Sequence, residues 1–301
     1  MPRQVFNGFW YGNELSPLEW ACLNSFIEHG HRFRLFCYDL IRVPNGVWLE
    51  DASRIAPKDE LFLVNGNVAA FSDLFRYRIM QRYGEWWADT DVYCLKDDIP
   101  ECDYAWAKED QDNINGAVLK FPSNDTTLSD ISRAAYAIGN KTNVWCELGP
   151  HLLTRHLAGR VFDNHFGNRH CFYPIHWLES FLFWLPYQND RVRLKCKDSF
   201  FLHFWNSVFD RIGIDRYTKP PVGSFLDAIY CPHMSRFSLR ELDVNSYKRT
   251  IELIKAFVKG ESKTSERKLG YDVAKYPFDD LIDYVVTPER LDGEGLDSLE
   301  N

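Results

Sequence analysis

The stretch from Asn67 to Leu95, NVAAFSDLFRYRIMQRYGEWWADTDVYCL, decides the fold, because it reads as a helix that leads directly into an extended segment. Asn67 is a suitable N-cap, and Gly84 suits the left-handed residue at which a helix ends. Apolar residues between them recur at i, i+3 and i+4, which predicts one broad buried face. That face consists of Phe71, Leu74, Phe75, Tyr77, Ile79, Met80 and Tyr83.

Four charged residues of this stretch, Asp73, Arg76, Asp89 and Asp91, are spaced so that the members of each pair lie on one side of their element. Asp73 and Arg76 lie three residues apart and share a helix face, although by spacing alone they are an ordinary surface ion pair. The aromatic and β-branched residues at 86–87 and 92–93 favour an extended strand, interrupted by Asp89 and Asp91. Because residues two apart on an extended segment project to the same side, these aspartates can hold one divalent cation.

The segments before this stretch predict a parallel sheet. Residues 4–11 form a first apolar strand, a capping box at residues 16–19 begins a helix that ends at Gly30, and residues 32–38 form a second strand. A strand, helix and strand of this length imply a right-handed parallel unit, which places ligands at the carboxyl ends of its strands. Trp10 and Tyr38 should lie near that edge.

The rest of the chain reads as an alternation of strands and helices without internal repeats. A clean amphipathic helix at residues 244–259 is expected to pack on the body, with docking on anionic lipid as the alternative. Further strands are predicted at residues 47–49, 104–107, 116–119, 170–177 and 199–204, and further helices at residues 126–138 and 149–157.

Composition limits the function classes. The chain has 301 residues, of which 45% are hydrophobic and 16% aromatic, so it can bury a large core. Its net charge of −8 argues against a nucleic-acid partner. Residues 279–300 hold eight acidic residues and the single basic Arg290, so the acidity belongs to the C-terminal tail and the body is nearly neutral.

The sequence predicts a cytoplasmic protein, with peripheral attachment at the inner face of the membrane as an alternative. The start, Met1-Pro2-Arg3, does not resemble a secretory signal, and no apolar run approaches the roughly 20 residues of a spanning helix. The eight cysteines contain no CxxC pair, so we expect buried thiols in a reducing compartment. The segment Cys231-Pro232-His233 is only superficially similar to half of a metal site.

Several ordered motifs resemble the glycosyltransferases that carry the DXD sugar-binding motif, a group including α-1,4-galactosyltransferases, yeast-type mannosyltransferases and clostridial glucosylating toxins. The resemblance rests on Ser72-Asp73-Leu74-Phe75-Arg76 and on Tyr83-Gly84-Glu85-Trp86-Trp87-Ala88-Asp89-Thr90-Asp91. Glu85 departs from the pattern, which often has a second glycine there. Gly149-Pro150 and His203-Phe204-Trp205-Asn206 are similar to two further elements, so that the resemblance covers roughly residues 4 to 210.

The resemblance implies an α/β fold of the GT-A type, with a mixed, mainly parallel sheet flanked by helices in a single domain with a C-terminal helical extension. Residues 1–240 would form the glycosyltransferase domain, residues 241–278 a helix and linker beside it, and residues 279–301 an acidic tail. It also implies a nucleotide-sugar donor, Mn²⁺ or Mg²⁺, and retention of anomeric configuration.

Site roles follow from the same resemblance. Asp91 would bind the metal directly, Asp89 would bridge metal and ribose, and His203 would be a further ligand or a diphosphate contact. Asp73 would bind donor-sugar hydroxyls, while Arg76 would orient Asp73 or reach sugar and phosphate oxygens. The remaining candidates are Trp10 for stacking on the base, Trp205 and Asn206 for diphosphate, and Asn115 for donor or acceptor.

From this resemblance we interpret the protein as a metal-dependent retaining glycosyltransferase acting in polysaccharide synthesis. UDP-hexose is the preferred donor and GDP-mannose the next, with a glycan or lipid-linked glycan as acceptor. The alternatives are a sugar nucleotidyltransferase, which would need a basic glycine-rich loop that residues 7–13 lack, and a non-catalytic binding module. No nucleophile is selected among Glu109, Asp110, Asp112 and Glu147.

Overall fold

The computed structural model describes residues 4–142, 144 and 146–258. The chain divides into two compact units. Of the described residues, the first unit comprises those within Met1–Leu15, Glu19–Pro174 and Asp198–His203, and the second comprises those within Ser16–Leu18, Ile175–Lys197 and Phe204–Asn301.

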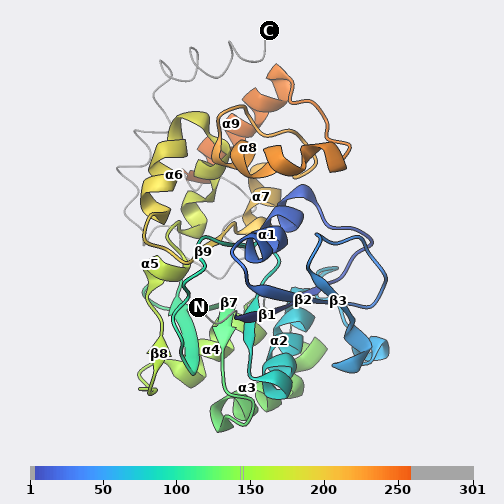
Figure 1. Ribbon diagram of the computed structural model, residues 1–301, viewed down its shortest axis with the longest axis vertical. Coiled ribbons are helices and arrows are strands. Elements are labelled where there is room, and N and C mark those ends of the chain that lie inside the picture. Colours follow the sequence, from blue (N-terminus) through green and yellow to red (C-terminus); the bar gives the residue numbers. More distant parts are fainter. Residues whose placement is uncertain (1–3, 143, 145, 259–301) are drawn as a thin grey trace. The chain divides into compact units, whose positions relative to one another are not determined.

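The first unit is built on a seven-stranded mixed sheet with the strand order β3-β2-β1-β4-β7-β6-β8 (Figure 1). Strand β1 is parallel to β2 and β4, β2 is parallel to β3, and β6 is parallel to β8, while β7 is antiparallel to β4 and β6. This arrangement confirms the predicted α/β class and agrees with a GT-A-type sheet. The strands are β1 (Val5–Trp10), β2 (Arg32–Cys37), β3 (Trp48–Asp51), β4 (Trp86–Ala88), β6 (Tyr104–Lys108), β7 (Ile114–Lys120) and β8 (His165–Phe166).

Alternation along the strands sends aromatic side chains to both faces of the sheet. Phe6 of β1 packs on Phe26 of helix α1, with ring centroids 4.6 Å apart. Phe9 of the same strand packs at 4.5 Å on Phe75 of helix α2. The helices of this unit are α1 (Pro17–Glu28), α2 (Ala69–Tyr83), α3 (Thr126–Ile138), α4 (Leu152–Leu157) and α5 (Arg169–Phe172), with short 3-10 turns at Ala52–Arg54, Lys58–Glu60 and Gly139–Lys141.

Helix α2 lies close to its predicted position. Its C-cap is Gly84 at φ 65°, the left-handed conformation that glycine adopts without strain. Its N-cap is Val68 rather than the predicted Asn67. The Asn67 side chain still accepts a hydrogen bond at 2.7 Å from the backbone N–H of Ala69, so it satisfies a free donor of the first turn from one position further out.

A second, two-stranded sheet pairs β5 (Val92–Cys94) antiparallel with β9 (Phe201–His203). In its register Val92 lies opposite His203, and Cys94 lies opposite Phe201. Two segments that are about a hundred residues apart in sequence therefore meet directly after the aspartate turn.

The second unit is helical and has an aromatic core. The Phe183 ring lies 4.8 Å from Phe204 and 5.9 Å from Phe225, and Trp184 stacks on Tyr247 at 5.0 Å. Its helices are α6 (Asn189–Cys196), α7 (Asn206–Ile212), α8 (Phe225–Tyr230) and α9 (Val244–Val258), with 3-10 segments at Trp177–Trp184, Pro186–Gln188 and Cys231–Arg236.

One predicted strand is wrong. Residues 170–177 were expected to be extended because of their aromatic content, but they contain the end of α5 and the start of a 3-10 helix. Side-chain caps explain the difference. Asn168 accepts from the backbone N–H of His170, and His176 forms a reciprocal capping box with Glu179, so local hydrogen bonds outweigh β propensity.

Helix α9 begins at the predicted residue, and its apolar face packs within the second unit. Tyr247 stacks on Trp184, and the Phe257 ring lies 6.5 Å from Trp177. This burial favours the packed interpretation of α9 over lipid docking. None of the helices among the described residues is long and apolar enough to cross a membrane. The linker beyond α9 and the acidic tail at residues 279–301 lie outside the described residues, and the domain boundaries at 240 and 278 stay a prediction.

Candidate metal and donor site

Three predicted metal ligands of the first unit converge. Asp89 follows β4, Asp91 precedes β5, and His203 ends β9. One ligand atom from each lies within 4.8 Å of the others, and His203 Nε2 is 3.3 Å from Asp91 Oδ2. Among the described residues, this is the one group of three or more His, Cys, Asp or Glu side chains so arranged, and Cys231 and His233 do not form a second.

Local structure explains the convergence. The backbone N–H of Val92 donates to the carbonyl of Asp89 at 3.1 Å, which closes a turn between β4 and β5. The aspartates therefore approach each other through a turn rather than through strand alternation. The β5–β9 register then places His203 opposite Val92, beside Asp91.

The donor set fits a divalent cation. Two carboxylates and one imidazole are common ligands of such ions. Two ligands at right angles around an ion with bonds of about 2.1 Å lie about 3 Å apart. The 3.3 Å between His203 Nε2 and Asp91 Oδ2 is close to that separation.

Arg76 connects the helix to this cluster. Its Nη1 lies 3.0 Å from Asp73 Oδ1, and its Nη2 donates to Asp89 Oδ1 at 3.0 Å. The indole N–H of Trp87 donates to the same Asp89 oxygen at 2.8 Å. Arg76 is predicted to orient Asp73, and it contacts Asp89 as well. One oxygen of Asp89 therefore accepts from two donors, Arg76 and Trp87.

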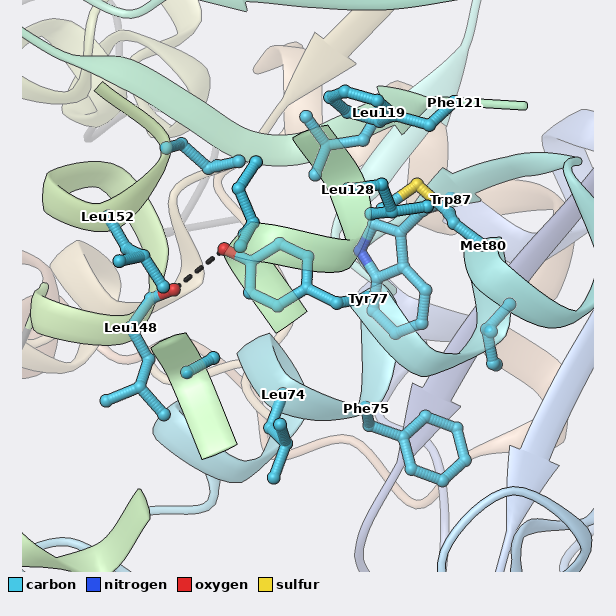
Figure 2. Close-up of a cluster of buried hydrophobic side chains, with 14 of the residues drawn as sticks. Leu74, Phe75, Tyr77, Met80, Trp87, Leu119, Phe121, Leu128, Leu148 and Leu152 are labelled. Carbon is cyan, nitrogen blue, oxygen red and sulfur yellow. Dashed lines mark hydrogen bonds between the residues drawn. The ribbon is translucent and has the colours of Figure 1, made fainter. Parts of the chain in front are cut away.

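Two glycines allow the close packing around this ion-pair group. A Cβ at Gly116 would lie 2.1 Å from Arg76 Nη1, and a Cβ at Gly149 would lie 2.8 Å from Asp73 Oδ2. Gly149 belongs to a turn of π-helix, Glu147–His151, which the Tyr77 hydroxyl anchors by donating to the carbonyl of Leu148 at 2.7 Å (Figure 2). A side chain at Gly149 would therefore displace the Asp73 carboxylate.

Burial and charge shift the pKa values of the cluster. Burial raises the pKa of Asp73 to about 6, against the opposing effect of Arg76. Burial likewise raises the pKa of Asp89, while Arg76 acts in the opposite direction. Burial alone lowers the pKa of His203, but Asp91 and Asp89 raise it by more, so that it lies above the usual histidine value.

The other predicted site residues have distinct surroundings. Trp10 is half-buried at the end of β1, and its indole N–H donates to the carbonyl of Glu14 at 3.1 Å. Asn115 is buried on β7 and bonded to Glu109. Trp205 and Asn206 belong to the second unit, so their predicted contact with the donor diphosphate stays a prediction.

Trp205 has an unusual backbone. Its φ of 58° is left-handed, a conformation that a bulky residue adopts only under constraint and that costs roughly 1–3 kcal/mol. Its indole N–H donates to the carbonyl of Ile175 at 2.9 Å. Backbone strain of this kind concentrates at functional sites. It therefore agrees with the prediction that Trp205 has a functional role.

Glu85, the departure from the family pattern, has a structural explanation. Its carboxylate accepts from Asn7 Nδ2 at 3.0 Å and lies 3.4 Å from Arg34. Asn7 is fully buried on β1 and also donates to the carbonyl of Trp86. Glu85 therefore satisfies polar groups of the sheet, and the departure does not touch the aspartate turn.

The fold is α/β and consistent with the GT-A type, and comparisons with known proteins support the glycosyltransferase class. Residues 136–238 match the alpha 1,4-glycosyltransferase conserved region, which confirms the resemblance to glycosyltransferases. The matched region contains Gly149 and His203 but not Asp89 and Asp91.

A comparison with curated proteins finds no match. Among solved structures, the chain is similar to one described as "PaToxG Glycosyltransferase", with 12% identity and a TM-score of 0.41. The similarity covers 51% of this chain and 67% of that one. At this TM-score it carries no argument about function.

Proposed function

We propose that this protein is a metal-dependent, retaining glycosyltransferase that moves a hexose from a nucleotide sugar to a hydroxyl of a glycan or lipid-linked glycan, in polysaccharide synthesis. UDP-hexose is the preferred donor and GDP-mannose the next. The observation that carries the proposal is the convergence of Asp89, Asp91 and His203 beside the Asp73–Arg76 pair. The glycosyltransferase match over residues 136–238 supports the class.

The chemistry of the leaving group fits this site. When bound, a divalent cation would supply a Lewis acid that stabilises the negative charge developing on the nucleoside diphosphate. Asp91 and His203 would hold that cation together with Asp89, whose carboxylate is fixed by Arg76. The imidazole in the donor set favours Mn²⁺ over Mg²⁺, which prefers oxygen ligands.

Other candidate residues of the first unit would hold the rest of the donor. Trp10, at the carboxyl end of β1, is proposed to stack on the base, and Asp73 to accept from sugar hydroxyls. Arg76 neutralises part of the charge of Asp73 and Asp89, so that the diphosphate meets less repulsion. Retention requires attack on the same face as departure or a covalent intermediate, and both routes need the sugar held firmly.

A thermal-shift panel tests donor binding. UDP-glucose, UDP-galactose, UDP-N-acetylglucosamine and GDP-mannose are added with and without Mn²⁺. A ligand that binds only the folded protein must raise its unfolding temperature, so we expect a metal-dependent rise with a UDP-sugar. A rise without hydrolysis or transfer would favour the binding module, and release of pyrophosphate from UTP and a sugar phosphate would favour the nucleotidyltransferase.

Asp91→Asn tests the metal assignment. The amide keeps the size of the side chain but removes the charge that holds the cation, so Mn²⁺-dependent donor hydrolysis and transfer should fall at least 100-fold. Circular dichroism should show the fold unchanged. Asp98→Asn, an exposed aspartate beyond β5, is the matched control and should retain activity. Full activity of Asp91→Asn would refute the proposal.

A further inference from the structure

The structure distinguishes the carboxylates among which sequence alone selects none. Asp110 accepts from the backbone N–H groups of Asp112 and Asn113 at 2.8 and 2.7 Å, so it shapes the β6–β7 loop. Asp112 itself is exposed, and Glu147 lies in an ion pair with Arg155 at 3.5 Å. Glu109 is as buried as Asp110, 4% against 5% exposed, and it differs from the other three carboxylates because it is bonded to a predicted site residue, Asn115.

Glu109 and the backbone together fix the amide of Asn115. Asn115 Nδ2 donates to Glu109 Oε2 at 2.6 Å, and Asn115 Oδ1 accepts from the backbone N–H of Ala117 at 2.7 Å. A carboxylate can only accept and a backbone N–H can only donate, so these two bonds allow one amide orientation. Within the described part of the chain, the second Nδ2 hydrogen of Asn115 has no acceptor.

This amide belongs to the same framework as the metal ligands. The carbonyl of Ala117, whose N–H bonds Asn115, accepts from the backbone N–H of Asp89 at 2.8 Å. The β6–β7 register shifts between the Ala105–Lys120 and Ala107–Asn115 pairs, so the ladder is irregular directly beside Asn115.

We propose that Glu109 is a positioning residue: it holds the Asn115 carboxamide so that the remaining Nδ2–H donates to an oxygen of the bound nucleotide sugar. This inference rests on the proposed function. Glu109 itself does not touch the substrate, and its carboxylate acts through Asn115. A fixed donor of this kind contributes to the transition state without reorganisation.

A double-mutant cycle tests the inference with the panel donor that the wild type hydrolyses fastest. Glu109→Ala and Asn115→Ala should each lower kcat about 10–100-fold with little change in the donor KM, and the double variant should lose no more than either single variant. Glu109→Gln should stay within about threefold of the wild type, because its amide oxygen still accepts from Asn115. Gln111→Ala, exposed on the same loop, is the control.

A second readout separates positioning from folding. The rise in unfolding temperature caused by Mn²⁺ alone should be the same in Glu109→Ala as in the wild type, since Glu109 is not a metal ligand. Should Glu109→Ala fail to fold, Glu109→Asp replaces it. That variant keeps the charge but withdraws the carboxylate by one methylene, and should lose activity as well.

Three results would overturn the inference while the proposed function stands: additive losses in the double variant, unchanged kcat in Glu109→Ala, or a Glu109→Gln variant as inactive as Glu109→Ala. The last would mean that the charge of Glu109 acts directly. A wild type that neither binds nor hydrolyses any donor of the panel would instead refute the proposed function, and this inference with it.

Discussion

Two arginines of this protein form an i, i+3 ion pair with an aspartate on a helix, and burial separates them. Arg76 and Asp73 have side chains 6% and 10% exposed, whereas Arg133 and Asp130 are 77% and 57% exposed. Sequence spacing is identical in the two pairs and could not distinguish them. The difference comes from the sheet, since β7 brings Gly116 against the Arg76 guanidinium.

A comparison of Arg76→Met with Arg133→Met tests this difference. Arg76→Met leaves Asp73 and Asp89 without their shared counter-charge, so the free energy of unfolding should fall by about 3–5 kcal/mol. Arg133→Met breaks an exposed pair and should cost about 0–1 kcal/mol. Urea denaturation at neutral pH measures both values. Equal losses in the two variants would show that the Arg76 bridge is not a buried structural contact.

The sequence does not indicate which carboxylate of the β6–β7 loop binds Asn115. Glu109, Asp110 and Asp112 lie in one short polar loop, and their order does not indicate which of them become buried or which partner each one binds. The partners of these carboxylates are set by hydrogen bonds that form when the β6–β7 hairpin closes. Asp110 accepts from N–H groups of the loop, and Glu109 accepts from Asn115. A glutamate six residues before an asparagine is too weak a sequence signal to predict the hydrogen bond between them.

Among the elements, helix α2 and strands β1, β2 and β7 could be predicted because caps, turns and apolar period agree. The turn of π-helix at Glu147–His151 could not. The sequence indicates a helix start at Gly149-Pro150, but the wide turn forms because α2 provides a partner for it. Such turns are frequent at functional sites, and this one brings Gly149 against Asp73.

Tyr77→Phe tests the coupling between α2 and this turn. The change removes the hydroxyl that donates to the Leu148 carbonyl and leaves that carbonyl without its bond, so the free energy of unfolding should fall by about 1–3 kcal/mol. Because Gly149 follows Leu148, donor KM should rise as Asp73 loses its neighbour. Tyr136→Phe on α3, whose side chain is exposed, is the control. An unchanged donor KM would show that the turn does not affect donor binding.

At the scale of the whole molecule, the site depends on one long-range pairing. The sequence shows two aspartates and, far along the chain, a histidine in a family-like element, but only the β5–β9 register brings them together. Strand pairing over such a separation is set by the whole sheet and not by local pattern. The convergence that the resemblance led us to expect for Asp91 and His203 is therefore a finding of the structure.

Metal binding should accordingly stabilise the entire protein. Mn²⁺ at about 100 times its dissociation constant should add about 2.7 kcal/mol to the free energy of unfolding, because the unfolded chain does not hold the three ligands together. His203→Gln removes one ligand. If the dissociation constant rises tenfold, the gain at the same Mn²⁺ concentration falls to about 1.4 kcal/mol. His170→Gln, an exposed histidine, should behave as the wild type.

The same measurement has a definite pH dependence. Asp91 and Asp89 raise the pKa of His203 above its usual value despite burial, so a proton competes with Mn²⁺ for Nε2 up to a higher pH than at a free histidine. The Mn²⁺-induced gain should therefore be full at pH values above that pKa and shrink as pH falls through it. In His203→Gln the gain should change less over this range. Urea unfolding with and without Mn²⁺ at several pH values gives both curves, and a wild-type gain that grows as pH falls would exclude His203 as a ligand.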